Sequence, residues 1–355
     1  MDRTLSAPGK LFLAGEYAVL WGGEARILGT APRAHALVRS RQDRRVEIAL
    51  PGARLTGDAT PAGVRWHTPI TDAFRFVAVA IDLAYRASGV EGPGFSVAFE
   101  PSPLVNGHKL GLGSSARATV LAVEAARHAL SAKWDSLKLS LLAHFDAQGG
   151  KGSGGDIAAS FAGGVVRYRR FEVAPLATAA VSGSLTAALE KSPPVELARL
   201  GDLSFPCVYA FSGESASTPG LVKQVEQKLG AEGRKRFVDR SDTHSMALES
   251  ALLRRDFEAL KSSCGALQAL LWELEVTHND ALERIVGIAR TLGCAAKQSG
   301  AGGGDGAIIF APDEAVAAQV SESLQARGFH TFLTKSDRGL QGEVAPDSTL
   351  ASWLD

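Results

Sequence analysis

The sequence has few of the features that mark secreted, membrane or nucleic-acid-binding proteins. Its three cysteines, Cys207, Cys264 and Cys294, form no C-x-x-C pair, which argues against a disulfide framework and a structural zinc site. No uninterrupted apolar run approaches the ~20 residues that a membrane helix needs. The 38 basic and 38 acidic side chains cancel, so no global field attracts nucleic acid or an anionic membrane. We therefore expect a cytoplasmic protein that binds neither nucleic acid nor a membrane.

The length and apolar content predict two domains. The chain has 355 residues, 45% of them hydrophobic, and single cores rarely grow beyond ~250 to 300 residues. A stretch over 174–203 is rich in small residues, contains Pro193-Pro194 and shows no clear strand core. We expect the domain boundary there, with domains over 1–195 and 196–355.

The order of elements predicts an α+β fold. In the first part, strands are expected over 10–20, 34–39, 45–50, 95–99 and 163–168, and helices over 71–87 and 136–147. In the second part, a strand over 207–211 precedes helices between 219 and 292, strands over 295–297 and 307–310, a helix over 313–326 and a strand over 330–334. This β-helix-β-β-helix-β order is typical of a ferredoxin-like sandwich with helical insertions.

The segment from Lys109 to Ala116 has the pattern of an anion-binding loop. Gly111 and Gly113 let the backbone approach a bulky anion, and Ser114 or Ser115 can cap the helix that follows. The first N–H groups of that helix have no partner inside it, so a phosphate there meets backbone donors and a favourable dipole. A glycine-rich turn with an ordinary serine cap explains this segment alone equally well.

Two further glycine-rich loops favour polyphosphate binding over simple turns. They are Lys151-Gly-Ser-Gly-Gly-Asp156 and Lys297-Gln-Ser-Gly-Ala-Gly-Gly-Gly-Asp-Gly306, and each carries charged or hydroxyl side chains that a turn does not need. The G-x-x-x-x-G-K-[ST] pattern of the Walker phosphate-binding loop does not occur in the sequence. Gly111-x-Gly113-x-x-Ala116 and Gly150-x-Gly152-x-x-Gly155 match the dinucleotide fingerprint weakly. Asp135 lies at a suitable distance along the sequence for a ribose contact, so a nicotinamide enzyme stays a rival.

Three segments resemble, in order and spacing, the signature motifs of the GHMP kinases. They are Ala7-Pro-Gly-Lys-Leu-Phe-Leu-Ala-Gly-Glu-Tyr-Ala-Val-Leu20, Gly111-Leu-Gly-Ser-Ser-Ala116 and Ser299-Gly-Ala-Gly-Gly-Gly-Asp305. The resemblance covers nearly the whole chain. It implies an N-terminal domain like the second domain of ribosomal protein S5, a ferredoxin-like C-terminal domain, and a cleft between them for ATP with Mg²⁺.

The resemblance also implies roles for individual residues. Lys10 and Asp156 are expected near the acceptor oxygen as catalytic residues, and Ser115 reaches Mg²⁺ through the bound nucleotide. Asp156 is also expected to cap the helix after it, and to orient Lys10 or the acceptor. The expected ATP-binding residues are Lys109, Gly111, Leu112, Gly113, Ser114, Ser115 and Ala116. The expected substrate-binding residues are Lys10, Glu16, Tyr17, Lys151, Ser153, Gly154, Ser215, Ser217, Thr218, Ser299, Gly300, Ala301 and Gly302.

Within the superfamily, three segments are similar to those of phosphomevalonate kinases. They are the loop starting at Lys109, the stretch over 147–158, and Ala216-Ser-Thr-Pro219, where a helix start offers a seat for the acceptor phosphate. The resemblance implies small-molecule substrates, ATP and phosphomevalonate, and a monomer or homodimer. Mevalonate kinase, another small-metabolite kinase and a non-catalytic paralogue remain alternatives.

Two features depart from the family pattern. Arg117 stands where the family mostly has a small residue. The magnesium carboxylate that mevalonate kinases carry upstream of the Asp156 loop has no obvious equivalent, and Asp146 is the nearest candidate in the sequence.

Overall fold

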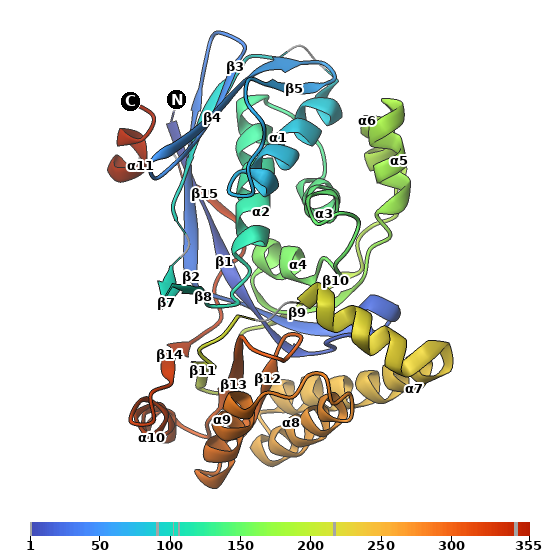
Figure 1. Cartoon of the computed structure of the whole chain (residues 1–355), viewed down its shortest axis with the longest axis vertical. Coiled ribbons are helices and arrows are strands. Elements are labelled where there is room, and N and C mark those ends of the chain that lie inside the picture. Colours follow the sequence, from blue (N-terminus) through green and yellow to red (C-terminus); the bar gives the residue numbers. More distant parts are fainter. Residues whose placement is uncertain (1, 90–91, 102, 106, 216–217, 344–346) are drawn as a thin grey trace.

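Two sheets with helices on their faces make up the molecule (Figure 1). The computed structural model describes residues 2–89, 92–101, 103–105, 107–215, 218–343 and 347–355. The expected α+β fold is confirmed, with one sheet built mainly from the first half of the chain and the other from the second half.

The first sheet is antiparallel except where β3 and β6 pair in parallel. Its path runs β10-β9-β2-β6-β3-β4-β5, and β1 pairs with β2 and with β15. The long β2 holds the sheet together, because its two halves pair with different strands, β9 and β6. The strands are β1 (Asp2–Ala14), β2 (Glu24–Ser40), β3 (Arg45–Leu50), β4 (Ala53–Thr60), β5 (Gly63–Trp66), β6 (Phe95–Phe99), β9 (Gly164–Arg169), β10 (Leu197–Gly201) and β15 (Gln341–Glu343).

Four helices cover one face of this sheet (Figure 1). They are α1 (Arg75–Ser88), α2 (Ser114–Ala129), α3 (Ser136–Ala147) and α4 (Gly155–Ala162), and α5 (Ala174–Ser182) and α6 (Leu185–Lys191) lie beyond them. A small hairpin, β7 (Leu104–Val105) and β8 (His108–Lys109), leads into α2. The expected helix over 71–87 begins later, at Arg75. Asp135, the candidate ribose contact, caps α3 by accepting from the N–H groups of Leu137 and Lys138.

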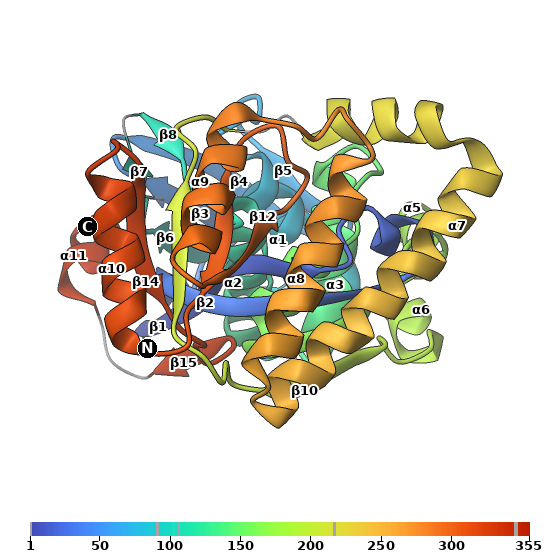
Figure 2. The ribbon, with the colours of Figure 1, turned by 90° about the horizontal axis from the view of Figure 1, so that it is seen from below.

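The second sheet has the order β12-β13-β11-β14, with every neighbouring pair antiparallel. Its strands are β11 (Cys207–Phe211), β12 (Ala295–Ser299), β13 (Gly306–Phe310) and β14 (His330–Thr334). Its helices are α7 (Thr218–Arg254), α8 (Phe257–Trp272), α9 (Asp280–Thr291) and α10 (Glu314–Gln325), and Figure 2 shows α8 to α10 over the strands. Gly230 interrupts α7 with a φ of 60°, so α7 consists of two helical segments.

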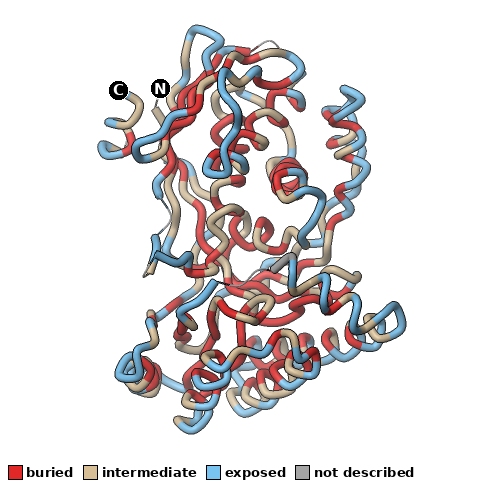
Figure 3. Tube along the Cα trace, in the orientation of Figure 1, coloured by how far each residue is buried: buried red, intermediate tan, exposed pale blue. Residues whose placement is uncertain are grey.

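Apolar side chains join the two halves into one body. Along β11, Cys207, Tyr209 and Phe211 pack against Leu11 of the first sheet, whereas Val208 packs under α9 and α10. This period of two is what a strand buried on both faces requires. Figure 3 shows buried segments of the chain on both sides of the junction of the halves. Helix positions near this junction are therefore fixed relative to both sheets.

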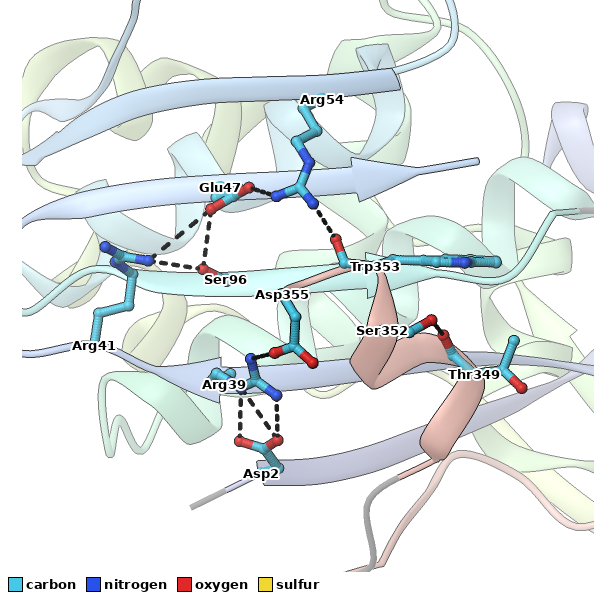
Figure 4. A network of polar contacts seen from close by, with 10 residues as sticks. All are labelled: Asp2, Arg39, Arg41, Glu47, Arg54, Ser96, Thr349, Ser352, Trp353 and Asp355. Atoms are coloured by element: carbon cyan, nitrogen blue, oxygen red, sulfur yellow. Dashed lines mark hydrogen bonds and ion pairs between the residues drawn. The ribbon is translucent and has the colours of Figure 1, made fainter. Parts of the chain in front are cut away.

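The C-terminal helix α11 (Ser348–Ser352) covers part of the other face of the first sheet (Figure 4). Leu350 packs on Leu37, Ala49 and Ala98. Polar contacts surround this patch: the Arg54 guanidinium donates to the Trp353 carbonyl at 2.7 Å and Arg39 pairs with Asp2 and Asp355, as the dashed lines of Figure 4 mark.

Two expectations about local structure were wrong. The strand expected over 10–20 ends at Ala14, because Gly15 and Tyr17 adopt φ values of 88° and 61° and turn the chain into the short 3-10 helix η1 (Ala18–Trp21). The region over 174–203 holds the helices α5 and α6 and the strand β10, which pairs with β9.

The chain does not divide between the sheets at a single point. Strand β10 follows the expected boundary between residues 195 and 196 and belongs to the first sheet, and β15 returns to pair with β1. A division at 195 and 196 therefore stays a proposal about folding units.

Candidate functional site

A cavity of about 940 Å³ lies where the first sheet and its helices meet the second half of the chain. Residues far apart in the sequence line it, from β1, the start of α2, the loop before α4, and the loop after β12. The predicted site residues on its wall are Lys10, Glu16, Tyr17, Lys109, Gly111, Leu112, Gly113, Ser114, Ser115, Lys151, Ser153, Asp156, Ser215, Gly300 and Ala301.

Helix α2 presents an uncapped N-terminus to the cavity. The expected serine cap was wrong: the N-cap residue is Gly113, in the left-handed region with φ 75°, and no side chain caps the helix. The Lys10 backbone N–H donates to the Leu112 carbonyl at 3.1 Å, and the Lys10 side chain lies over Gly113, where a Cβ would be only 2.9 Å from Lys10 Cγ. Backbone donors at this helix start can therefore face an anion.

The loop before α4 brings Asp156 to the same cavity. Here too the expectation of an N-cap was wrong, because Gly154 is the N-cap residue and Asp156 lies in the first turn. Its Oδ1 accepts from the Ile157 N–H at 3.0 Å, and its Oδ2 lies 3.7 Å from Nε2 of His144. Among the residues described, Asp156 has no ion pair with Lys10, and its role in orienting that lysine or the acceptor stays a prediction.

A buried ion pair joins the first motif to the third. Lys297, fully buried, donates to Glu16 Oε1 at 2.5 Å, and Glu16 is only 4% exposed. The Gly300 N–H points to the same oxygen at 3.4 Å. The Tyr17 hydroxyl donates to the Ala301 carbonyl at 2.6 Å, and burial raises the pKa of Tyr17 above its usual value. These contacts fix the loop after β12 against the end of β1.

Four predicted site residues lie off the cavity wall. Ala116 is buried in α2, and the Ser299 hydroxyl is used within the protein, donating to the Phe12 carbonyl at 3.0 Å. Gly302 has φ 77°, and a Cβ there would lie 2.6 Å from the Thr277 carbonyl oxygen. Gly154 serves as the N-cap of α4. These four residues therefore contribute to the local packing and backbone shape of the site and do not face the cavity.

The acceptor seat expected at the start of α7 lies partly outside the described residues. Ser217 and the side chain of Thr218 belong to that part, and α7 begins at Thr218. Ser215 lines the cavity, and its hydroxyl donates to the Lys109 carbonyl at 3.1 Å. This contact ties the start of α7 to the loop before α2.

Three residues of the site were not predicted from the sequence. Arg170, after β9, and Lys223, on α7, line the cavity. His144, on α3, lies behind the cavity wall, beside Ser115 and Asp156. Only His144 had a usable signal, since it follows Leu137 and Leu141 at helical spacing on one apolar face. The others are single basic residues without a motif.

The cavity wall is rich in positive charge. Seven basic and four acidic side chains line it. Over the described part of the chain, Arg75 is the only one of these basic residues that forms an ion pair, with Asp72. The six without an ion pair are Lys10, Lys109, Arg117, Lys151, Arg170 and Lys223. Charge of one sign in a cleft raises the local concentration of oppositely charged ligands. The site therefore suits a strongly anionic ligand.

The two departures from the family pattern have definite places. Arg117 is buried in α2 and donates to the Pro32 carbonyl at 2.8 Å, and burial lowers its pKa. Asp146 is exposed at the end of α3 and does not line the cavity. The side chain that lies beside Asp156 is that of His144, and not that of Asp146.

The donors at the cavity fit a magnesium–nucleotide complex better than a bare metal ion. No group of three or more His, Cys, Asp or Glu residues suited to a metal ion occurs within the described residues. The Ser115 hydroxyl and the Asp156 carboxylate supply two hard oxygen donors beside an anion-binding helix end. Magnesium takes one or two protein oxygens and completes its shell with phosphate and water.

None of the helices in the described parts of the chain is long and apolar enough to span a membrane. This agrees with the absence of long apolar runs in the sequence.

Comparisons with known proteins agree with the motifs. Residues 75–164 match the model of the GHMP kinases N terminal domain, and residues 248–330 match that of the GHMP kinases C terminal. A phosphomevalonate kinase of a Streptomyces species is 29% identical over 338 residues, 87% of this chain and 90% of the relative. One from Saccharolobus solfataricus is 27% identical over 350 residues, 96% of this chain and 98% of the relative.

The fold has a solved counterpart as well. The structure of Streptococcus pneumoniae phosphomevalonate kinase in complex with phosphomevalonate and AMPPNP matches with a TM-score of 0.80 and 22% identity, covering 94% of this chain and 99% of that one. With both family models matched in the expected order, the chain belongs to the GHMP kinases.

Proposed function

We propose that this protein is a phosphomevalonate kinase, which transfers the terminal phosphoryl group of ATP to the phosphate of (R)-5-phosphomevalonate and forms 5-diphosphomevalonate. The observation that carries the proposal is a cavity that combines an uncapped helix N-terminus with six basic side chains that form no ion pair among the described residues. The choice of substrate follows the two similar proteins, both of which are phosphomevalonate kinases.

One side of the cavity suits the nucleotide phosphates. The N–H groups at the start of α2 carry the positive end of the helix dipole, and the exposed Lys109 adds a full charge. Mg²⁺, when bound with ATP, would neutralise phosphate charge, and Ser115 and Asp156 are the residues that would hold it. Phosphoryl transfer depends mainly on such positioning and charge neutralisation.

The other basic residues suit the acceptor. Phosphomevalonate brings a second phosphate to a site that already holds a polyphosphate, so the acceptor needs its own positive charge. Lys10, Lys151, Arg170 and Lys223 supply that charge from β1, the loop before α4, the end of β9 and α7. The acceptor phosphate has a second pKa of about 6 and is largely ionised at neutral pH, so no strong general base is needed.

The function is tested by ADP release from the purified protein with phosphomevalonate, mevalonate or galactose as acceptor, with ATP and Mg²⁺ present. We expect phosphomevalonate to have the highest kcat/KM. A preference for mevalonate or galactose would assign the chain to another GHMP kinase. Absence of turnover with all three, while the protein still binds ATP, would indicate a non-catalytic paralogue.

Replacing Arg170 tests the acceptor side separately. Arg170→Gln is expected to raise the KM for phosphomevalonate by about 10- to 100-fold, because a charged hydrogen bond contributes about 1.5 to 3 kcal/mol. The KM for ATP should change less than threefold. The matched control is Arg169→Gln, since Arg169 pairs with Glu24 and Glu196 and does not line the cavity. Equal increases in both KM values would contradict an acceptor role for Arg170.

A further inference from the structure

A buried histidine lies between two residues of the proposed site. His144 on α3 is 2% exposed, and all the other histidines are half-buried or exposed among the described residues. Its Nε2 lies 3.1 Å from the Ser115 Oγ, at the start of α2, and 3.7 Å from Asp156 Oδ2, in the first turn of α4. One nitrogen therefore contacts side chains from two different helix starts.

Packing holds the imidazole in this place. The Phe76 ring of α1 lies against it, with ring centroids 5.2 Å apart and planes tilted by 35°. Leu141 and Leu137 precede it on the buried face of α3. A side chain enclosed in this way keeps one orientation, which a residue that positions others must do.

The chemistry of the two neighbours selects one tautomer. A carboxylate only accepts hydrogen bonds, whereas the serine hydroxyl both donates and accepts. A hydrogen on Nε2 of His144 therefore suits both: it forms the hydrogen bond to Ser115, and it faces the Asp156 carboxylate at 3.7 Å, a distance too long for a hydrogen bond. Ser115 then accepts from the histidine and keeps its own hydrogen and one lone pair for a ligand in the cavity.

We propose that His144 is a positioning residue for phosphoryl transfer: its Nε2–H orients the Ser115 hydroxyl and holds the Asp156 carboxylate beside it, so that both oxygens face the magnesium–nucleotide complex. The proposal rests on the function proposed above for the identity of the ligand. In this arrangement the magnesium oxygens come from Ser115 and Asp156, and Asp146, which is exposed and off the cavity wall, is not required.

The test compares His144→Leu with His144→Gln. Leucine fills a similar volume but cannot form hydrogen bonds, whereas the glutamine amide can donate to both oxygens. We expect His144→Leu to lower kcat by about 10- to 100-fold and to raise the Mg²⁺ concentration for half-maximal activity, as is usual for partners that orient ligands. His144→Gln should recover most of this loss. The KM for phosphomevalonate should change less than threefold in both.

A second measurement separates this proposal from the proposed function. Calorimetric binding of a non-hydrolysable ATP analogue, with and without Mg²⁺, reports the nucleotide site even if the acceptor is misidentified. We expect Mg²⁺ to strengthen binding to the wild type and to His144→Gln, and to have at least tenfold less effect on His144→Leu.

The control is His128→Leu, since His128 lies at the far end of α2, beside Glu124 and away from the cavity. It should leave the Mg²⁺ effect unchanged. The proposal is overturned if His144→Leu keeps the wild-type Mg²⁺ effect on binding and on kcat. It is also overturned if leucine and glutamine variants lose activity only in proportion to a lower Tm, which would indicate a purely structural histidine.

Discussion

Asp156→Asn is expected to lower kcat by about 10²- to 10⁴-fold or somewhat less, the range for one positioned acid–base group. Asparagine keeps the shape and the contact with the Ile157 N–H, but removes the charge that lies beside His144 and Ser115. Because phosphomevalonate is already ionised above a pH of about 6, the loss should be nearly independent of pH between 7 and 9. The measurement is kcat for both proteins between pH 6 and 9.

The matched control is Asp146→Asn, which changes an exposed carboxylate at the end of α3. Its kcat should stay within twofold of the wild type. An alcohol acceptor must lose a proton, so a base would be required and activity of Asp156→Asn would recover at high pH. Steep pH-dependent inactivation together with a preference for mevalonate would contradict the proposed acceptor.

Lys297→Met is expected to cause the largest loss of stability. Removing this fully buried amine leaves the Glu16 carboxylate, which is 4% exposed, without its counter-charge. Breaking one side of a buried ion pair typically costs about 3 to 5 kcal/mol of unfolding free energy. Urea denaturation measures the change, and the Tm should fall accordingly.

The double variant Lys297→Met/Glu16→Gln is the control for this explanation. A neutral amide at position 16 leaves no buried charge, so the double variant should be more stable than Lys297→Met alone. If the second substitution lowers stability further, the cost of Lys297→Met comes from lost packing. Nucleotide and acceptor KM values measured on the double variant then show how far the pair itself positions the loop after β12.

The glycine-rich loops were predictable because their chemistry is local. Gly111 and Gly113 were expected to bring the backbone close to other groups, and both adopt positive φ, 71° and 75°. The ferredoxin-like order was predictable too, since short apolar runs such as that of β11 alternate with amphipathic helices. The structure of these segments depends mainly on residues that are close together in the sequence, so the sequence pattern could predict it.

The helix caps show where local reasoning failed. Serines after glycine usually favour a serine cap, and at α2 the left-handed Gly113 takes that position while the Ser115 hydroxyl contacts His144. Likewise Asp156 lies two positions after Gly154, the N-cap residue of α4, and so cannot cap that helix. Both carboxylate and hydroxyl are turned toward a side chain from another helix, which no local propensity describes.

The sequence alone determined the fold class, the family and the three loops, because each depends on residues close together in the chain and on periodicity. Only the tertiary structure decided which charges meet. It placed Arg170 and Lys223 on one cavity wall, paired Glu16 with Lys297 across 281 positions, and put His144 rather than Asp146 beside Asp156. Such contacts depend on how sheets and helices pack. A single sequence does not show which residues far apart along the chain lie close together in space.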